Sequence, residues 1–544
     1  MNGGFSWNGK TLLSGIDPAG RANRAAEAVP VMDRTLYVCP SPLYGYGLEC
    51  LLNRIACFPH SVLLCIEADP ELFALSQKHF DTALQNNPQL RITNHCEAEA
   101  LCTLLRQEWG PRTFRRVQMV RLNGGWQLFP ALYDTVTEAL RQEIALDWGN
   151  ALTLTKLGRR YIRNAVRNLA LVPRCPSIAQ LSFGNDPVLV LGAGPALDAA
   201  LIIMPLAEPR PFRIICVDTC LPALRERGIT PDLAVILESQ HWNLEDFTGL
   251  SGWNVPVAMD LSALPRSAGI FSGGLSLFFT PWTDLAIFDR LAAAGLLPAA
   301  LPPLGSVGLS AVAIARLLSQ GPIITAGLDF SFTLDSYYAR STPGHKARLR
   351  RQNRFTSLLN PETVFGRAAL SAVSKTGGKV FSSPALRNYR DLFEREFAAD
   401  TQLFAIADSG LPLGLKTLSP EESCNILSLD STTNHTNHHE QRERDEGSCG
   451  SWLNNKQEAL QEFIKGEQDR LRLLRSMLVG EAPMDYAALE TLIGECDYLW
   501  AHFPDYAASD RRPSTSDISF LKRLRVEIDP FLKLWDMTNE CMLD

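Results

Sequence analysis

The stretch Val188-Leu189-Val190-Leu191-Gly192-Ala193-Gly194-Pro195-Ala196-Leu197-Asp198 predicts a buried strand, a tight turn and the start of a helix. Four consecutive apolar residues are typical of a buried strand, and Gly-x-Gly-Pro before an apolar periodic segment is typical of a helix start. Backbone amides in such a turn point outward at the positive end of the helix dipole, so the turn can hold a phosphate. Gly192, Gly194 and Pro195 are therefore candidate binding residues. The same turn also occurs as a simple connection without a ligand.

Further blocks repeat this pattern of an apolar strand followed by a polar turn. Strand patterns end at Asp218-Thr219 and at Glu238, and residues 322–326 form another that leads into Asp329. Gly305-Ser306 opens a helix of small residues. Ligands of open α/β sheets bind beyond the carboxyl ends of the strands. We therefore predict a nucleotide site that includes the following residues: Gly192, Gly194, Pro195, Asp218, Thr219, Glu238, Gly305 and Ser306.

Composition excludes several classes of function. The chain has 544 residues and 46% hydrophobic residues, enough for two to four domains with sizeable cores. The net charge of −7 provides no basic field for nucleic acid. We expect no membrane span, no secretory signal in residues 1–7 and hence a cytoplasmic protein. The 13 cysteines are scattered without zinc-ligand spacing, so we expect reduced thiols and no bound metal.

The order of patterns predicts an α/β protein. We expect a Rossmann-like domain over residues 1–150, a parallel-sheet nucleotide-binding domain over 151–415, a flexible linker over 416–450 and a helical module over 451–544. Strands of the central domain are expected at the following positions: 187–191, 213–217, 233–237, 255–259, 276–280 and 322–326.

The first domain carries a glycine-containing turn and an acid, Glu67, after its second strand. This pattern is compatible with S-adenosylmethionine or a dinucleotide, with Glu67 on the ribose. Pro40 and Pro42 remove backbone donors where a phosphate would need them. We therefore favour a domain without a ligand.

The central motifs carry a resemblance to a known family. Gly-Ala-Gly-Pro-Ala-Leu, Gly-Ile-x-Pro-Asp, Gly-Ser-Val and Gly-Leu-Asp-Phe occur in the order seen in Maf (motility-associated factor) proteins, which are regarded as flagellin glycosyltransferases. The central blocks also resemble a bacterial sialyltransferase family that uses CMP-sialic acid. Further matching segments extend the resemblance over most of residues 13–415, and they are the following: 13–18, 153–158, 382–389 and 407–410.

The resemblance implies a sialyltransferase-like (GT-A-like) central domain and an O-linked, inverting transfer. A nonulosonic sugar of the pseudaminic, legionaminic or sialic type would move from a CMP-sugar donor to Ser or Thr hydroxyls of flagellin. No tightly bound cofactor and no metal site are expected, and weak Mg²⁺ binding stays open. A direct displacement needs a general base for the hydroxyl and donors for the leaving phosphate.

The resemblance also suggests catalytic residues. His345 lies in the polar segment where the similar sialyltransferases place their catalytic histidine, and His241 is the other candidate base. Tyr337 or Tyr338 falls where those enzymes use a tyrosine on the leaving phosphate. Asp329, at the end of the last clear strand, is a further candidate or a cap of the following turn.

Departures from the pattern keep two rival functions open. Ala193 and Ser331 stand where the sialyltransferases have Asn and Tyr, which allows a non-catalytic flagellar accessory protein. The central domain also resembles an archaeal hydroxymethylpterin diphosphokinase, which would bind ATP, Mg²⁺ and a pterin. Arg340, Lys346 and Arg348 are either phosphate ligands or an exposed basic stretch.

Overall fold

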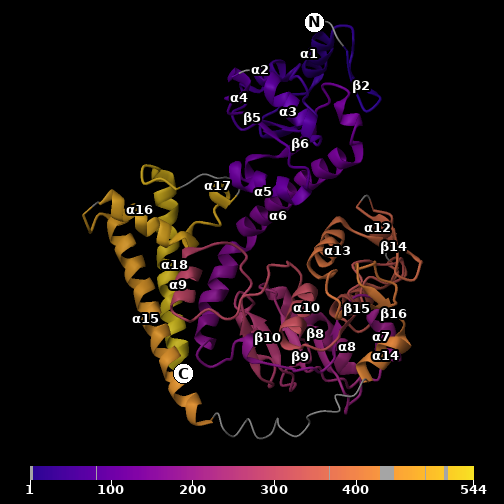
Figure 1. The fold of residues 1–544 in the computed structure, drawn as a ribbon. Helices are drawn as coiled ribbons and strands as arrows, with labels where there is room; N and C mark the ends of the chain where they lie inside the picture. Colours follow the sequence, from indigo (N-terminus) through magenta and orange to yellow (C-terminus); the bar gives the residue numbers. More distant parts are fainter. Residues whose placement is uncertain are drawn as a thin grey trace. The chain divides into compact units, whose positions relative to one another are not determined.

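The computed structural model describes residues 4–80, 82–359, 361–366, 368–428, 446–483, 485–507 and 513–543. The chain divides into two compact units (Figure 1). The N-terminal unit contains Met1–Gly158 with Trp500–Pro513, and the central unit contains Arg159–Leu499 with Ser514–Asp544. Each has its own parallel sheet covered by helices, so the predicted α/β class is confirmed.

The sheet of the N-terminal unit has the order β5-β4-β3-β6 and is parallel throughout. Its strands are β3 (Thr35–Pro40), β4 (Val62–Ile66), β5 (Leu90–Thr93) and β6 (Arg116–Met119). Alternate residues of β3 enter separate apolar clusters, Leu36 one and Tyr37 the other, as expected for a sheet covered on both faces. The accompanying elements are β1 (Phe5–Trp7), β2 (Lys10–Leu13), α1 (Pro18–Ala28), α2 (Leu48–Ile55), α3 (Pro70–His79), α4 (Thr82–Gln85), α5 (Ala98–Glu108) and α17 (Pro504–Ala507).

In the described residues, the sheet of the central unit has eight strands, all parallel, in the order β11-β10-β9-β8-β7-β12-β15-β16. They are β7 (Val188–Leu191), β8 (Arg213–Val217), β9 (Leu233–Ile236), β10 (Val257–Asp260), β11 (Leu275–Phe278), β12 (Ile323–Ala326), β15 (Leu403–Ile406) and β16 (Lys416–Leu418). Every strand predicted for this sheet is present. The last two were not predicted.

The strand order reverses at β7. Strands β8 to β11 follow on one side of it, whereas β12, β15 and β16 follow on the other. Chain segments that leave β7 and β12 therefore separate, and a crevice opens at the carboxyl ends of these strands. The helices between and after these strands, up to residue 428, are α7 (Leu197–Ile203), α8 (Leu221–Glu226), α9 (Ala286–Ala293), α10 (Val307–Leu318), α11 (Pro343–Arg351), α12 (Pro361–Val364), α13 (Pro384–Phe397) and α14 (Pro420–Ser428).

The long helix α6 (Pro130–Asn168) ends against the carboxyl edge of the central sheet. The Asn164 amide donates to the carbonyls of Ser239 and Ser262, and the Asn168 amide donates to those of Leu261 and Ala263. Both asparagines are almost fully buried. Because buried carbonyls need donors, these two side chains fix the loops that follow β9 and β10.

The C-terminal helices belong to the central unit. Helices α15 (Glu446–Val479) and α18 (Ile518–Leu543) run side by side, with α16 (Tyr486–Glu495) against α15 (Figure 1). Glu467 of α15 is fully buried, and its carboxylate receives two hydrogen bonds from Arg290 of α9, at 2.8 and 3.1 Å. This buried pair connects the helical module to the sheet domain.

The segment predicted as a linker is partly regular. Its first residues form the edge strand β16 and helix α14. Residues 429–445 of the predicted linker lie outside the described residues. The edge strand is hard to detect in the sequence because it is only three residues long and exposes Lys416 and Thr417.

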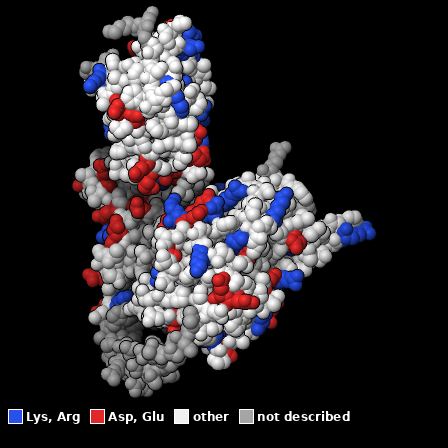
Figure 2. Space-filling view, turned by 45° about the vertical axis from the view of Figure 1, so that its right-hand side comes forward, with Lys and Arg blue, Asp and Glu red and all other residues white. Residues whose placement is uncertain are grey.

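The surface carries mixed charge. Figure 2 shows Lys and Arg interspersed with Asp and Glu over the described residues of the face in view. Within the described ranges, no helix is long and apolar enough to cross a membrane.

We predict that Glu467→Ala lowers the free energy of unfolding of the central unit by about 3 kcal/mol, because the Arg290 charge is left buried without its partner. Asp469→Ala is the matched control, since Asp469 on the same helix pairs with Arg472 and both side chains are more than half exposed. Its effect should stay below about 1 kcal/mol. Urea unfolding followed by circular dichroism measures both, and equal losses would contradict the prediction.

Candidate functional site

Strands β7 and β12 end so close together that neither turn has space for a side chain. A Cβ on Gly192 would lie 2.3 Å from the carbonyl oxygen of Gly327, and a Cβ on Gly327 would lie 2.4 Å from that of Gly192. Gly327 also has a φ of +72°, a conformation that favours glycine. Each position must therefore be glycine for the two strand ends to lie this close together.

The turn after β7 is held by residues that follow β12. The Gly194 amide donates to the carbonyl of Gly327 at 2.9 Å, and the Gly192 amide to that of Ala326 at 2.8 Å. The carboxylate of Asp329 accepts the Ala196 amide at 2.7 Å. These amides, which the sequence interpretation assigned to a phosphate, are thus engaged within the protein. Asp329 supplies the negative charge that favours the start of α7.

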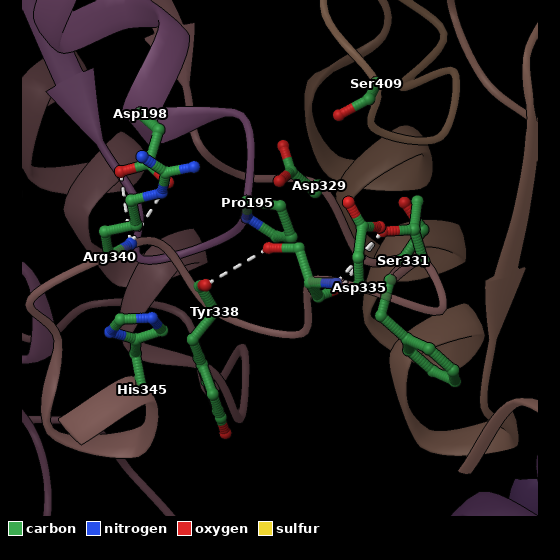
Figure 3. A pocket seen from close by; sticks show the side chains of 12 residues that line it. Pro195, Asp198, Asp329, Ser331, Asp335, Tyr338, Arg340, His345 and Ser409 are labelled. Atoms are coloured by element: carbon green, nitrogen blue, oxygen red, sulfur yellow. Dashed lines mark hydrogen bonds and ion pairs between the residues drawn. The ribbon is translucent and has the colours of Figure 1, made fainter. Parts of the chain in front are cut away.

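A pocket of about 380 Å³ lies at this point, where the strand order reverses (Figure 3). Pro195 and Asp198 contribute from the turn and first residues of α7, and Ser409 from the segment after β15. The remaining lining residues follow β12, and they are Asp329, Ser331, Phe332, Thr333, Asp335, Ser336, Tyr338, Arg340 and His345. Of the predicted site residues, the pocket therefore brings together Pro195, Asp329, Tyr338 and His345.

Asp329 is the most perturbed group in this pocket. Its side chain is 2% exposed, and burial together with the nearby charge of Asp408 raises its pKa to about 7. Asp408 follows β15 and pairs with the ammonium group of Lys375 at 2.7 Å. Lys375 lies in the turn between β13 (Leu370–Val373) and β14 (Lys379–Ser382). Sequence reasoning assigned no role to either partner of this ion pair.

His345 lies in the first turn of α11, where its backbone amide is capped by the hydroxyl of Thr342 at 3.4 Å. Its Nδ1 accepts the backbone N–H of Ser341 at 3.3 Å. A neutral imidazole carries one proton, so an Nδ1 that accepts a hydrogen bond leaves the proton on Nε2. His345 is then a donor at Nε2. This geometry favours a donor role over the general-base role expected from the sequence.

The two tyrosines have different positions. Tyr338 lines the pocket, and its ring lies against the start of α11, because a Cβ on Gly344 would be 2.5 Å from that ring. Burial raises the pKa of Tyr338, so its hydroxyl remains a donor. Tyr337 instead stacks on Phe332, with ring centroids 4.8 Å apart. Tyr337 is not a lining residue of this pocket.

A second polar cluster lies at the ends of β8 and β9. Asp218 accepts the Thr219 amide at 2.8 Å and the Asn243 side-chain amide at 3.0 Å. The Thr219 hydroxyl lies 3.2 Å from a carboxylate oxygen of Asp218 and of Asp246. Burial raises the pKa of Asp218 to about 6, and burial with the Asp218 charge raises that of Asp246 to about 7. Asp218, predicted to contact a ligand, is thus engaged in a local network.

Glu238 lies at the same edge of the sheet, just after β9. Its carboxylate accepts the Gln240 backbone amide at 2.9 Å. His241, the other candidate base, is exposed in the short helix η6 (His241–Glu245). His241 does not line the pocket.

The predicted turn Gly305-Ser306 forms the start of α10. Gly305 has a φ of +65°, and Ser306 is the N-cap residue. A Cβ on Gly305 would be 3.6 Å from the ring of Tyr389. Because α10 leads back to the first residues of β12, its start lies at the carboxyl edge of the sheet, near the other candidate residues.

The predicted cations have separate partners. Arg340 lines the pocket, and its largely exposed guanidinium lies 3.9 Å from the carboxylate of Asp198, which also accepts the Arg340 backbone amide at 3.1 Å, as Figure 3 shows. Lys346 pairs with Glu226 at 2.5 Å, and the guanidinium of Arg348 donates to the carbonyl of Leu359. Arg340 is therefore the member of this set that a ligand in the pocket would meet.

In the N-terminal unit, Glu67 is engaged by the protein itself. The Ser41 hydroxyl donates to its carboxylate at 2.6 Å and the Asp69 amide at 3.2 Å. Burial raises the pKa of Glu67 to about 7. In the preceding turn, a Cβ on Gly45 would be 2.7 Å from the ring of Phe80. Hydrogen bonds within the protein thus explain the position of Glu67, and packing against Phe80 explains the glycine at position 45.

One part of the pocket wall that was not predicted does have a recognisable sequence pattern. The sequence Ala407-Asp408-Ser409-Gly410 follows the apolar run of β15, so it repeats the strand-and-polar-turn pattern of the other site segments. Lys375 had no such signal, because it reaches Asp408 from a separate hairpin. In the described part of the chain, no group of three or more His, Cys, Asp and Glu side chains could hold a metal ion.

Comparisons with known proteins agree with this architecture. The model of the 6-hydroxymethylpterin diphosphokinase MptE-like family matches residues 159–335. An uncharacterized protein of Treponema pallidum (strain Nichols) is 31% identical over 525 residues, which cover 94% of this chain and 89% of the relative.

Among solved structures, a MAf glycosyltransferase from Magnetospirillum magneticum AMB-1 is similar with a TM-score of 0.56 and 14% sequence identity. The match covers 99% of this chain and 88% of that chain, so the shared fold includes both units. The fold expected from the resemblance to Maf proteins is confirmed. The chain therefore belongs to one family with the Treponema pallidum protein, with an MptE-like region at its centre and the fold of a Maf glycosyltransferase.

Proposed function

We propose that this protein is a glycosyltransferase that moves a nonulosonic sugar from a CMP donor to Ser or Thr hydroxyls of flagellin in the cytoplasm. The observation that carries this proposal is the pocket at the reversal of strand order, in a chain with the fold of a Maf glycosyltransferase. Its wall combines hydrogen-bond donors for a leaving phosphate with a buried carboxyl group. The sugar and the acceptor come from the sequence resemblance.

The donors are placed on one segment. Arg340 and the Nε2–H of His345 both follow β12, and both residues line the pocket. In an inverting displacement, negative charge grows on the departing phosphate as its bond to the sugar breaks. Fixed donors that meet this charge lower the barrier, and a guanidinium group meets two phosphate oxygens at once.

The opposite wall is suited to a polyol. Ser331, Ser336, Ser409 and Asp335 line the pocket with hydroxyl and carboxylate oxygens. Sugar hydroxyls donate to such acceptors, and the reacting carbon would lie between this wall and the donors. We assign the sugar of the donor to this side.

A second candidate function rests on the MptE-like match over residues 159–335. That name predicts binding of ATP with Mg²⁺ and of a pterin. Thermal-shift measurements distinguish the two functions: CMP should raise the unfolding temperature, whereas ATP with Mg²⁺ should not. The opposite result would favour the pterin kinase.

The proposal that flagellin is the acceptor is tested in the cell. We expect the intact mass of flagellin to fall by the mass of one or more nonulosonic residues when the gene is deleted. Restoration by the wild-type gene but not by a pocket variant is the control. An unchanged flagellin mass would favour the non-catalytic accessory protein.

We predict that Gly194→Ala abolishes most transfer. A Cβ at this position would be 2.5 Å from the Asp329 carboxylate and 2.8 Å from the Gly327 carbonyl, so Asp329 must move. A misplacement of about 1 Å at a reacting centre costs about 100-fold in rate. Gly274→Ala is the control, because its Cβ would meet nothing within 4 Å. Wild-type rates for Gly194→Ala would show that the Asp329 position is irrelevant to transfer.

We predict that His345→Ala lowers kcat by about 100-fold, because one donor to the developing phosphate charge is lost. His345→Gln keeps an N–H donor and should recover a large part of this loss. The affinity for CMP, measured by calorimetry, should change only a few fold in both variants. Equal losses in the two variants, with a changed pH profile, would instead make His345 the general base.

A further inference from the structure

Two buried carboxyl groups lie near each other at the pocket, and one of them, Asp329, lines it. Asp329 and Asp408 are 2% and 8% exposed. A Cβ on Gly410 would be 3.0 Å from the Oδ1 atom of each, so these two oxygens lie no further apart than twice that distance. Among the described residues, Oδ1 of Asp329 and Oδ2 of Asp408 are buried oxygens without a hydrogen-bond partner. Two adjacent ionised carboxylates in such a place repel each other strongly.

The hydrogen bonds distinguish the two acids. Oδ1 of Asp408 accepts the Gly410 amide at 2.8 Å and the Lys375 ammonium at 2.7 Å, and both interactions favour the ionised form. Asp329 receives one backbone amide, that of Ala196. The lysine side chain is only 2% exposed, so this ion pair is hardly screened by water.

The hairpin of β13 and β14 holds Lys375 in place. Backbone hydrogen bonds join Phe381 to Phe332, in both directions, at 2.8 and 2.9 Å. The Lys375 amide donates to the carbonyl of Gly410 at 2.9 Å. The hairpin therefore connects the segment after β12, which carries Asp329, with the segment after β15, which carries Asp408.

We propose that Asp329 accepts the proton of the incoming hydroxyl, that the charge of the neighbouring Asp408 opposes ionisation of Asp329, and that the Lys375 ammonium, by pairing with Asp408, offsets part of that charge. This rests on the proposed glycosyl transfer. Asp329 is the catalytic residue, whereas Asp408 and Lys375 are positioning residues that act through it.

The step balances without another reactant. The acceptor O–H bond breaks and its proton passes to the carboxylate of Asp329. The acceptor oxygen bonds to the anomeric carbon, and the bond from that carbon to the phosphate oxygen breaks, with its electron pair leaving on the phosphate. Asp329 then returns the proton to water. His345, a donor at Nε2, serves the phosphate on the other side of the reaction.

The charges around Asp329 set the pH at which this step begins. Burial and the negative charge of Asp408 raise its pKa to about 7, and Lys375 lowers it. Asp198 on α7 also raises it, but less. The other charged or titratable groups that line the pocket are Asp335, Tyr338, Arg340 and His345. Because the base must be ionised, activity should rise with pH through this pKa.

The experiment removes each partner of the ion pair. Lys375→Met removes the positive charge, so the Asp329 pKa and the acidic limb of the pH–rate profile should move upward by about one unit. Asp408→Asn removes the negative charge, so both should move downward. A merely structural ion pair would lower activity in both variants without opposite shifts. Lys375→Arg keeps the charge and should retain the wild-type profile.

Two readouts keep the outcomes distinct. The carboxyl carbon of Asp329 is titrated by NMR in the free full-length protein with labelled aspartate, and its resonance is identified by its loss in Asp329→Asn. Transfer rates against pH are measured separately. Lys379→Met, on the same hairpin, is the control, because Lys379 lies over the ring of Phe381 and should alter neither readout. If Lys375→Met does not fold, the Asp329 pKa and the pH–rate profile are compared between Asp408→Asn, Lys375→Arg and the wild type.

Titration of Asp329 in the ordinary acid range, or shifts in the same direction in both variants, would overturn the coupling of Asp329 to the Asp408–Lys375 pair. Transfer whose acidic limb does not follow the titration would overturn Asp329 as proton acceptor and leave the transferase function intact. Opposite NMR shifts in a protein that transfers no sugar would support this coupling and reject the function.

Discussion

The contact between Gly192 and Gly327 is the constraint on which the site depends. Each glycine stands where its own Cβ would meet the backbone of the other, so the ends of β7 and β12 leave no space for a side chain. This proximity brings the Gly194 amide onto the Gly327 carbonyl and Asp329 onto the start of α7. A larger residue in either position would separate the two segments and move the carboxyl group that lines the pocket.

That arrangement changes what the glycine turn does. A strand–Gly-x-Gly–helix sequence commonly offers its amides to a phosphate. Here a carboxylate from the neighbouring strand already occupies the Ala196 amide at the positive end of the dipole. A second anion at this point would be repelled by Asp329 whenever that group is ionised. Other polar side chains of the pocket, Arg340 and His345, lie on the segment that follows β12.

The sequence predicted those features that depend on local pattern. Apolar runs identified the strands from β7 to β12, and the polar residues at their ends, including Asp329, lie at one sheet edge. The apolar run of β15 is as long as those of β7 and β12 but was overlooked, whereas β16 has only three residues and exposes two of them. Side chains that act across the fold could not be found this way. Lys375 reaches Asp408 from a distant hairpin, and Asn164 reaches carbonyls after two different strands.

The same long-range contacts explain how a buried acid can be held ready for reaction. A carboxyl group with a raised pKa makes the ionised native state less stable, so the surrounding structure must fix its position independently. Gly410, which has no space for a side chain beside Asp329, also donates to Asp408 and accepts from Lys375. One residue thus places both acids and the cation. The glycine contact fixes Asp329 from the other side, so contacts within the protein determine the position of this carboxyl group.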